Sequence, residues 1–479
     1  MNPRAIALAL LLLPACDQVF GVDPPAPPVL RGTFEVRRVL NDAMGVPRYE
    51  VVPPDPVRAS VTATFADRSQ RAIELAEDGS FEIERPDASG RYRLMFQLDN
   101  QLIEVQHTAP ELAYEMFQLG RPNEERTPPI QQTLVATPLT LSKVYFASTG
   151  LWSWTEAAND VTTTRIDWRH HASLFGRRGL LDASRGDRLY ALRYESDGLF
   201  APNVLASYTM REVTMVDGES VDLPLGETQV PATSCGAVTA PVVEEGTRFA
   251  AALPGWTDLA VSARLQATPD LSFGATAALD LVFSAAFADR DLTRTVRYGN
   301  PFPATSMIAS TRYELKRTLR APGLLPVVIP SRLEHYVEIA GGDQCASPIA
   351  LHGAVAIPGA ASLDGTPLLD DGTPVRLDRS RDSLLTWEAS DGPVDRYAVQ
   401  LVEVYEEVFF GFALSRVIRT YVTVDRELVI DPALLVPGAF YAFMIRADAG
   451  FPGAASGALT EYTYPRSVAS TYTGLFVIQ

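Results

Sequence analysis

Neighbouring carboxylates are the residues of this sequence best suited to chemistry. They occur at Glu244–Glu245, Asp370–Asp371 and Glu406–Glu407, and glycoside hydrolysis needs only two carboxyl groups about 5 to 10 Å apart. Adjacent acidic residues are, however, more typical of a solvated face or turn. We therefore predict no catalytic residue, and we keep a carbohydrate-active hydrolase with carboxylates in the middle region as an alternative.

Histidine and thiol chemistry is poorly represented. The five histidines include one adjacent pair, His170 and His171, whose side chains face opposite sides of a strand and cannot converge on one metal ion without a bend. The sequence contains no nucleophile elbow, zinc-protease motif, phosphate-binding loop, calcium loop or C-x-x-C pair. We expect neither a metal site nor a cofactor.

Two tryptophans suggest binding instead. Trp152 and Trp154 lie two residues apart, so on a strand they share a face and could present parallel rings to a sugar or a peptide. Packing in the protein core is the competing interpretation. The pair is the candidate ligand platform of this sequence.

The N-terminus has the pattern of an export signal. Arg4 precedes an apolar segment, Ala5–Leu13, which is too short to span a bilayer. Its end, Leu13–Cys16, resembles the lipobox of bacterial lipoproteins, which implies a signal peptide at 1–15 and a lipid on Cys16. Residues 16–30 are rich in proline and predict a semi-rigid tether. An ordinary cleaved signal with an incidental cysteine is the alternative.

Cys235 and Cys345 remain once Cys16 is assigned to the anchor. Two cysteines in an exported protein allow one intramolecular bridge, and neither has a second cysteine or histidine at metal-ligand spacing. We predict a Cys235–Cys345 disulfide, with two buried free thiols as the alternative.

Composition sets the size of the body and excludes some partners. The 479 residues suffice for three or four domains of ordinary size. The net charge, 41 − 58 = −17, disfavours nucleic acid and anionic lipid surfaces as partners. Apart from the signal, no segment is apolar enough for a transmembrane helix.

Short strands dominate the chain after residue 30. Segments such as 60–65, 189–194 and 397–404 are rich in β-branched and aromatic residues and are bounded by Gly, Pro, Asp and Asn. Glu111–Leu119, flanked by Pro and Gly, is the best helix candidate. The predicted fold class is all-β, with tandem antiparallel β-sandwich modules after a cleaved lipoprotein signal peptide.

The first module is expected at residues 31–135. It contains Asp78–Ile83 and Gly90–Phe96, two strands with alternating apolar residues, the first of which follows an Asp-Gly turn. This pattern is similar to the transthyretin-like, carboxypeptidase-regulatory type of β-sandwich. The resemblance implies a non-catalytic spacer.

The last module is expected at residues 361–479 and resembles a fibronectin type III domain. The resemblance rests on Trp387, on Tyr397–Leu401 and on Leu435–Ala447. It implies that Trp387 packs in the core and that Tyr441 forms a tyrosine corner. The residues between the two named modules form β-rich modules of unknown family at 136–225 and 226–360, the second of which holds the predicted disulfide.

These features predict a lipid-anchored protein of the bacterial cell envelope that presents a non-catalytic binding or structural surface. We expect it at the outer membrane, on the periplasmic face or the cell surface. The expected partners are the membrane, through the lipid on Cys16, and an envelope protein or polysaccharide, with no nucleic acid. Besides the hydrolase, an accessory subunit of an envelope or secretion assembly is the remaining alternative.

Overall fold

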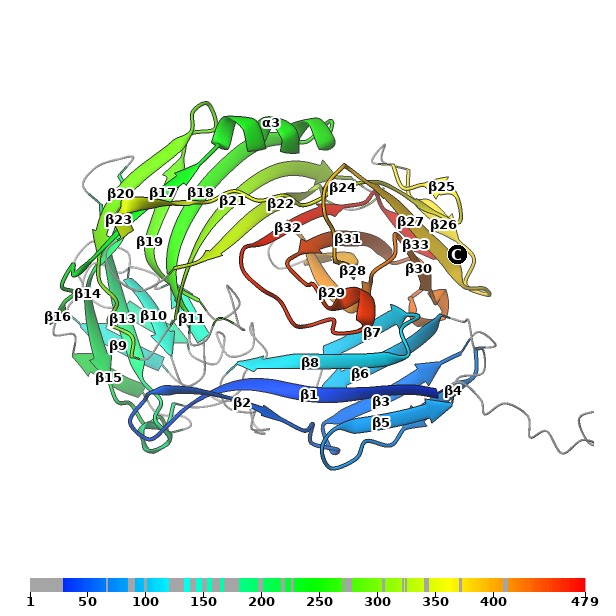
Figure 1. Ribbon diagram of the computed structural model, residues 1–479, viewed down its shortest axis with the longest axis horizontal. Coiled ribbons are helices and arrows are strands. Elements are labelled where there is room, and N and C mark those ends of the chain that lie inside the picture. Colours follow the sequence, from blue (N-terminus) through cyan, green and yellow to red (C-terminus); the bar gives the residue numbers. More distant parts are fainter. Residues whose placement is uncertain are drawn as a thin grey trace, which may run out of the picture.

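Strands make up most of the molecule, as the computed structural model shows (Figure 1). The predicted all-β sandwich fold is confirmed. In the described part of the chain, no helix has the length and apolarity needed to cross a membrane. The structure describes residues 29–478 except 66–67, 85–90, 99–100, 120–132, 138–143, 149–152, 157–163, 168–180, 197–200, 217–219, 225–227, 269–270, 272–277, 304–305, 321–322, 324, 340–343, 370–372 and 408–411.

Two sheets face each other in the N-terminal part. One has the order β2-β1-β5, with β8 parallel to β1, and the other runs β4-β3-β6-β7. Between them, Phe96 stacks on Tyr114 and meets Phe34 edge to face. The predicted Asp78-Gly79 turn is present, because Gly79 has a φ of +80° and Asp78 accepts a hydrogen bond from the Ser80 N–H. The strands are β1 (Val29–Asn41), β2 (Pro47–Val52), β3 (Ala59–Thr64), β4 (Gln70–Ile73), β5 (Ser80–Glu84), β6 (Tyr92–Leu98), β7 (Gln101–His107) and β8 (Glu111–Leu119).

The prediction of a helix at Glu111–Leu119 is wrong, because this segment is strand β8. Leu112, Tyr114 and Met116 are all buried and alternate with more exposed neighbours, which is the period of a strand. The flanking Pro and Gly are common at strand ends too, and the pairing with β1 decides between the two structures.

Two sheets also face each other in the C-terminal part. One has the order β25-β24-β27-β30, and the other contains β29-β28-β31 followed by β32 and β33. Trp387 and Tyr397 are buried between them with ring centroids 5.1 Å apart. The Val436 N–H donates to the Tyr441 hydroxyl at 2.9 Å, so this tyrosine is bonded to the backbone five residues before it. The strands are β24 (Pro358–Leu363), β25 (Thr366–Pro367), β26 (Val375–Leu377), β27 (Ser383–Ala389), β28 (Arg396–Glu407), β29 (Phe412–Thr423), β30 (Glu427–Ile430), β31 (Phe440–Ala449), β32 (Arg466–Tyr472) and β33 (Phe476–Ile478).

The middle of the chain is built on four long strands that arch beneath one helix (Figure 1). The strands are paired in the order β19-β18-β21-β22, and helix α3 (Val242–Ala252) lies on the outer side of the arch. The strands of this region are β17 (Ser234–Ala240), β18 (Thr257–Thr268), β19 (Leu279–Ala286), β20 (Leu292–Tyr298), β21 (Ser306–Leu319), β22 (Val327–Glu338) and β23 (Gln344–Ala350). The strands before them are β9 (Thr133–Thr137), β10 (Val144–Ser148), β11 (Ser153–Glu156), β12 (Thr164–Asp167), β13 (Leu189–Glu195), β14 (Asn203–Arg211), β15 (Ser220–Pro224) and β16 (Thr228–Gln229).

The predicted Cys235–Cys345 disulfide is confirmed. It joins β17 to β23, which lie side by side as parallel strands, and the two Cα atoms are 5.3 Å apart. That separation is normal for a disulfide. The bridge closes a loop with a sequence separation of 110 residues, so it ties together the two ends of the middle region.

One sheet runs through all three parts. β7 pairs in parallel with β29 through Ile103 and Thr420, and β22 pairs antiparallel with β32 through Leu333 and Ala469. A continuous path of paired strands therefore leads from β4 to β11, in the order β4-β3-β6-β7-β29-β28-β31-β32-β22-β21-β18-β19-β14-β13-β10-β11.

The turn of the β1–β2 hairpin, in the N-terminal part, contacts the segment just before β13, near the other end of this path of strands. The Asn41 side-chain amide donates to the Gly186 carbonyl at 2.9 Å, and Arg188 donates to the Ala43 carbonyl at 3.4 Å. Gly186 has a φ of +80°, and a methyl group on it would overlap the Asp42 carbonyl oxygen. We call this contact the hairpin clasp, since only glycine fits at its centre.

Candidate functional site

The face of the arch that is turned away from α3 carries most of its charged side chains. Residues alternate along each strand, so Val261 and Leu265 of β18 belong to the core together with Phe249 of α3. Arg264, between them, points to the other face. We call this polar inner face the inner lane. Its members are Ser262, Arg264, Gln266, Asp280, Ser310, Arg312, Glu314, Arg332, Glu334 and Tyr336.

Hydrogen bonds connect the first half of the inner lane across three strands. The Gln266 amide donates to Asp280 of β19 at 2.9 Å, and the Ser310 hydroxyl of β21 donates to Gln266 at 3.3 Å. Arg264 lies 3.4 Å from the same aspartate. Burial raises the pKa of Asp280, and Arg264 and the Gln266 hydrogen bond oppose the rise.

Ion pairs connect the second half. Arg312 of β21 pairs with Glu334 of β22, and Tyr336 donates to the same carboxylate at 2.9 Å. In the second pair the arginine is on β22 and the glutamate on β21: Arg332 lies 3.1 Å from Glu314. A hollow of about 60 Å³ opens between Arg264 and the Arg312–Glu334 pair, which leaves room for a few water molecules or one small polar group.

The inner lane continues into a buried charge cluster on β28, β31 and β32. Arg466 of β32 is the strand partner of Tyr336 and lies 3.6 Å from Asp448 of β31. Arg396 and Arg446 each donate to Asp448 at 3.0 Å. Burial alone would raise the pKa of Asp448, but the three guanidinium groups outweigh it and hold the pKa at about 2. This aspartate is therefore ionised at neutral pH and neutralises only part of the surrounding positive charge.

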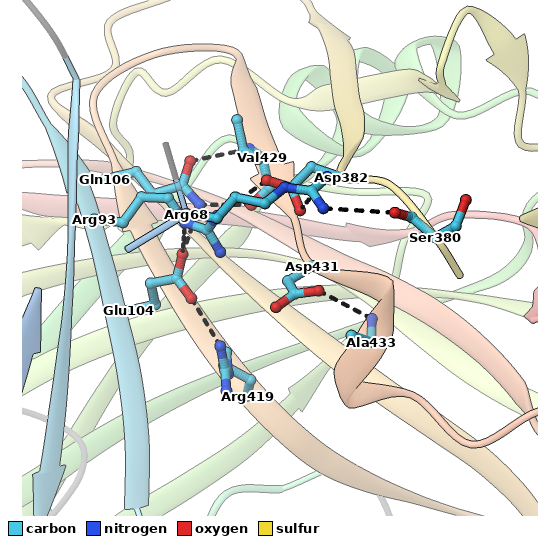
Figure 2. A network of polar contacts seen from close by, with 10 residues as sticks. All are labelled: Arg68, Arg93, Glu104, Gln106, Ser380, Asp382, Arg419, Val429, Asp431 and Ala433. Atoms are coloured by element: carbon cyan, nitrogen blue, oxygen red, sulfur yellow. Dashed lines mark hydrogen bonds and ion pairs between the residues drawn. The ribbon is translucent and has the colours of Figure 1, made fainter. Parts of the chain in front are cut away.

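A second polar network joins the N-terminal and C-terminal parts (Figure 2). Glu104 of β7 is almost completely buried, and it accepts hydrogen bonds from Arg93 and Arg419 at 2.8 Å each. Gln106 donates to the Val429 carbonyl and accepts from the Val429 N–H. Glu104 thus bonds to β29 and Gln106 to β30 (Glu427–Ile430) of the C-terminal part, so the network fixes one part against the other rather than binding a ligand.

A serine, a histidine and a carboxylate also meet beneath α3. The Ser467 hydroxyl and His335 Nδ1 are 2.9 Å apart, and His335 Nε2 is 3.8 Å from Glu245. Both Ser467 and His335 are buried, and a methyl group on Gly353 would overlap the Ser467 hydroxyl oxygen. The hydroxyl is thus covered by backbone, and the set serves to hold α3 on the sheet, where Arg248 also donates to the Val355 carbonyl.

The predicted site residues are placed as follows. Cys16 and Trp152 lie outside the described residues, whereas the backbone of Trp154 lies on β11 at the end of the long sheet. The platform and the lipid anchor therefore stay predictions. Among the described residues, no group of three His, Cys, Asp or Glu side chains is arranged to hold a metal ion.

The carboxylate pairs predicted to be solvated behave differently from one another. Glu244 is exposed, whereas its neighbour Glu245 is largely buried and pairs with Arg248 at 2.6 Å. Asp370–Asp371 lies outside the described residues, as does the His170–His171 pair. Only the backbone of Glu406–Glu407 is described, within β28.

The residues of the inner lane were missed by the sequence analysis. The available signal was the alternation of polar with apolar residues in Ser262–Gln266 and in Arg312–Lys316. Alternation shows that a strand has one polar face, but it does not show which strands are neighbours. The ion pairs join residues 16 to 22 positions apart, so they exist only because of the strand order.

Comparison with known proteins adds little to this description. No family model and no curated protein matches the chain. A solved structure of the native conformation of E. coli alpha-2-macroglobulin aligns with 94% of this chain and 28% of that chain, at 10% identity and a TM-score of 0.12. This chain thus spans 28% of the length of that protein. A TM-score this low does not show a shared fold. The functional interpretation therefore rests on the geometry of this chain.

Proposed function

We propose that this protein is a lipid-anchored component of the bacterial cell envelope that binds an envelope polysaccharide or protein through its inner lane, without catalysis. The anchor is a lipid on Cys16, and residues 16–30 are the tether. The observation that carries the proposal is the inner lane itself. Its arginines keep part of their surface open, with side chains of Arg264, Arg312 and Arg332 between 30% and 43% exposed.

The chemistry of the inner lane suits a polyhydroxylated or polar chain. Guanidinium groups only donate hydrogen bonds and carboxylates only accept them, whereas a hydroxyl group does both. The inner lane alternates the two kinds of group from β19 to β22, over three strand spacings or about 14 Å. An extended polar polymer can therefore satisfy several of these groups at once.

The arrangement of the sheets supports a rigid presenting body. The order β24-β27-β30 against β29-β28-β31, with the tyrosine corner at Tyr441, supports a fibronectin type III-like module at 361–479. The two facing sheets around Phe96 support a transthyretin-like module at 31–135. Modules of both kinds are spacers by resemblance. Here the shared sheet and the Glu104 network hold them in fixed relation to the inner lane.

A hydrolase is the second candidate, and one observation favours it. Burial raises the pKa of Asp280, which is bonded to two residues that line the hollow in the inner lane, and a raised pKa is the property of a general acid. Against it, the lane carboxylates Glu314 and Glu334 each pair with an arginine. Among the members of the inner lane, no unpaired carboxylate is then left to act beside Asp280.

Retention on envelope polysaccharide tests the proposal. The mature chain is passed over immobilised polysaccharide from envelopes, beside a variant with Arg264→Gln and Arg332→Gln in the inner lane. A control variant carries Arg376→Gln and Arg426→Gln, two exposed arginines outside the inner lane. We expect retention of the wild type and the control, loss with the lane variant, and no new reducing ends. If reducing ends accumulate, the protein is a hydrolase; if all three chains elute alike, the inner lane is not the binding surface.

The anchor has a separate test. Mass spectrometry of the mature N-terminus is expected to find a lipid on Cys16. A free amine on any other residue would remove the anchor from the proposal and leave the binding surface as it stands.

A further inference from the structure

A basic groove lies at the end of β21, beyond the charged pairs of the inner lane. Its volume is about 570 Å³, within the range of about 300 to 1,000 Å³ that is usual for small-molecule sites. Lys316 follows Arg312 and Glu314 at strand spacing, so it belongs to the same face of β21. The groove is lined by Pro254, Gly255, Thr257, Asp258, Lys316, Arg317, Thr318, Arg320 and Val328.

Positive charge is concentrated in this groove. Lys316, Arg317 and Arg320 line the groove together with a single acid, Asp258, in a chain whose net charge is −17. Lys316 is one of only two lysines in the sequence. Within the described part of the chain, neither Lys316 nor Arg320 makes an ion pair or a side-chain hydrogen bond, and both are exposed.

The third cation is held in place. Arg317 donates to the carbonyl groups of Tyr472 and Thr473 at 3.2 Å each, and its guanidinium lies 4.6 Å from the centre of the Trp256 ring. A cation above an aromatic face is stabilised by the ring. By strand alternation the Arg317 side chain leaves the face that carries Lys316, so the two cations free to close on a ligand are Lys316 and Arg320.

A β-bulge lies beside the groove. The pairing of β18 with β21 shifts register between Thr257 and Ala260, and Asp258 within the bulge has a φ of +58°. Such a backbone is strained for a non-glycine residue, and bulges are common beside functional sites because they redirect a strand. Here the bulge interrupts the regular pairing of β18 beside Lys316, at the mouth of the groove.

We infer that the groove binds a phosphate-bearing ligand. Lysine and arginine are the usual partners of phosphate, and their hydrogen bonds to it are stronger than neutral ones because both partners are charged. The volume exceeds what a phosphate ion needs, so the rest of the ligand also fits. A phosphorylated sugar and the headgroup of an anionic lipid share this chemistry, and the test separates them. The inference does not depend on the function proposed for the inner lane.

Binding is measured by calorimetry with glucose 6-phosphate, with glucose as the neutral probe, and by flotation with phosphatidylglycerol or phosphatidylcholine vesicles, using the mature chain without its lipid. The groove variant carries Lys316→Glu and Arg320→Glu. A second variant, with Lys316→Gln and Arg320→Gln, removes the charge without reversing it. The control variant, Arg376→Glu with Arg426→Glu, makes the same charge change at exposed positions outside the groove. Equal unfolding midpoints show that all variants fold.

We expect binding to glucose 6-phosphate but not to glucose, weakened about tenfold in the glutamine variant and more in the glutamate variant. Binding that appears only with phosphatidylglycerol vesicles, with the same loss in the groove variants, assigns the phosphate to a lipid headgroup. Absence of binding to either phosphate probe overturns the inference. So does binding that the control variant loses as much as the groove variants.

Discussion

Replacement of Asp448 by asparagine is the sharpest test of how the C-terminal sheet that contains β28, β31 and β32 is held together. Asp448 is fully buried, with Arg396 and Arg446 at 3.0 Å and Arg466 at 3.6 Å. Asparagine keeps the volume, so no cavity forms, but the buried cluster changes from a net charge of about +2 to about +3. Removal of one partner from a buried charge group costs about 3 to 5 kcal/mol, because the remaining charges lose their compensation. We expect a loss of that size in the free energy of unfolding.

Urea unfolding followed by near-UV circular dichroism measures this loss. The matched control is Glu82→Gln, which breaks the Arg31–Glu82 pair, whose side chains are 68% and 58% exposed. A surface pair of this kind is worth less than about 1 kcal/mol. If Asp448→Asn costs no more than Glu82→Gln, the charge cluster does not stabilise the fold, and the reasoning is refuted.

The free energy of unfolding, measured as a function of pH, tests the same charge cluster a second time. The pKa of Asp448 is about 2 in the folded chain, against an ordinary value of 3.8. Because the folded-state pKa is the lower one, this group contributes stability above pH 4 and the contribution disappears as the pH falls from about 4 to about 2. The difference corresponds to about 2 kcal/mol. The Asp448→Asn variant lacks this part of the acid destabilisation, so the two stability curves should approach each other below pH 4.

Three further predictions concern the contacts between the parts of the chain. Gly186→Ala should cost about 2 kcal/mol and speed hydrogen exchange at residues 41–46, because alanine is strained at positive φ and overlaps Asp42; unchanged exchange would mean that the hairpin clasp is not formed. Serine at both Cys235 and Cys345 should lower stability by about 4 to 5 kcal/mol by the loop-entropy argument, seen as a lower thermal midpoint, whereas an equal midpoint would argue against the bridge. Glu104→Gln should cost about 3 kcal/mol; a thermal midpoint equal to that of the wild type would show that the network of Figure 2 does not couple the parts.

Local chemistry made much of the fold predictable. The Asp78-Gly79 turn and the alternation in Tyr92–Leu98 follow from short-range sequence patterns, and the resemblance to a fibronectin type III domain implied the burial of Trp387; the structure confirms all three. The disulfide followed from the cysteine count and the inferred export. Each of these depends on a few neighbouring residues or on composition.

The sequence analysis predicted a helix where the structure has a strand, and it missed helix α3. Glu111–Leu119 had helix-like ends but the alternation of a strand, and the parallel partner β1 lies far away in sequence. Helix α3 was missed although Val242, Glu245, Gly246 and Phe249 are buried at helical spacing. Its buried glutamate and glycine hid the apolar stripe, since the sequence does not reveal that Glu245 meets His335 and Arg248.

Long-range pairing could not be predicted at all. The contacts of β7 with β29 and of β22 with β32 cross the predicted module boundaries at 135/136 and 360/361. Strand register between distant segments depends on complementary faces that only the folded chain brings together. For the same reason the inner lane is visible in the sequence only as separate polar residues.

Hydrogen–deuterium exchange of the mature chain, with and without solubilised envelope polysaccharide, tests the central claim most directly. The account predicts slower exchange in β18, β21 and β22 when the polysaccharide is present, and no such change in the variant with Arg264→Gln and Arg332→Gln. Protection confined to other strands, or equal protection in wild type and variant, would contradict the claim that the inner lane is the binding surface.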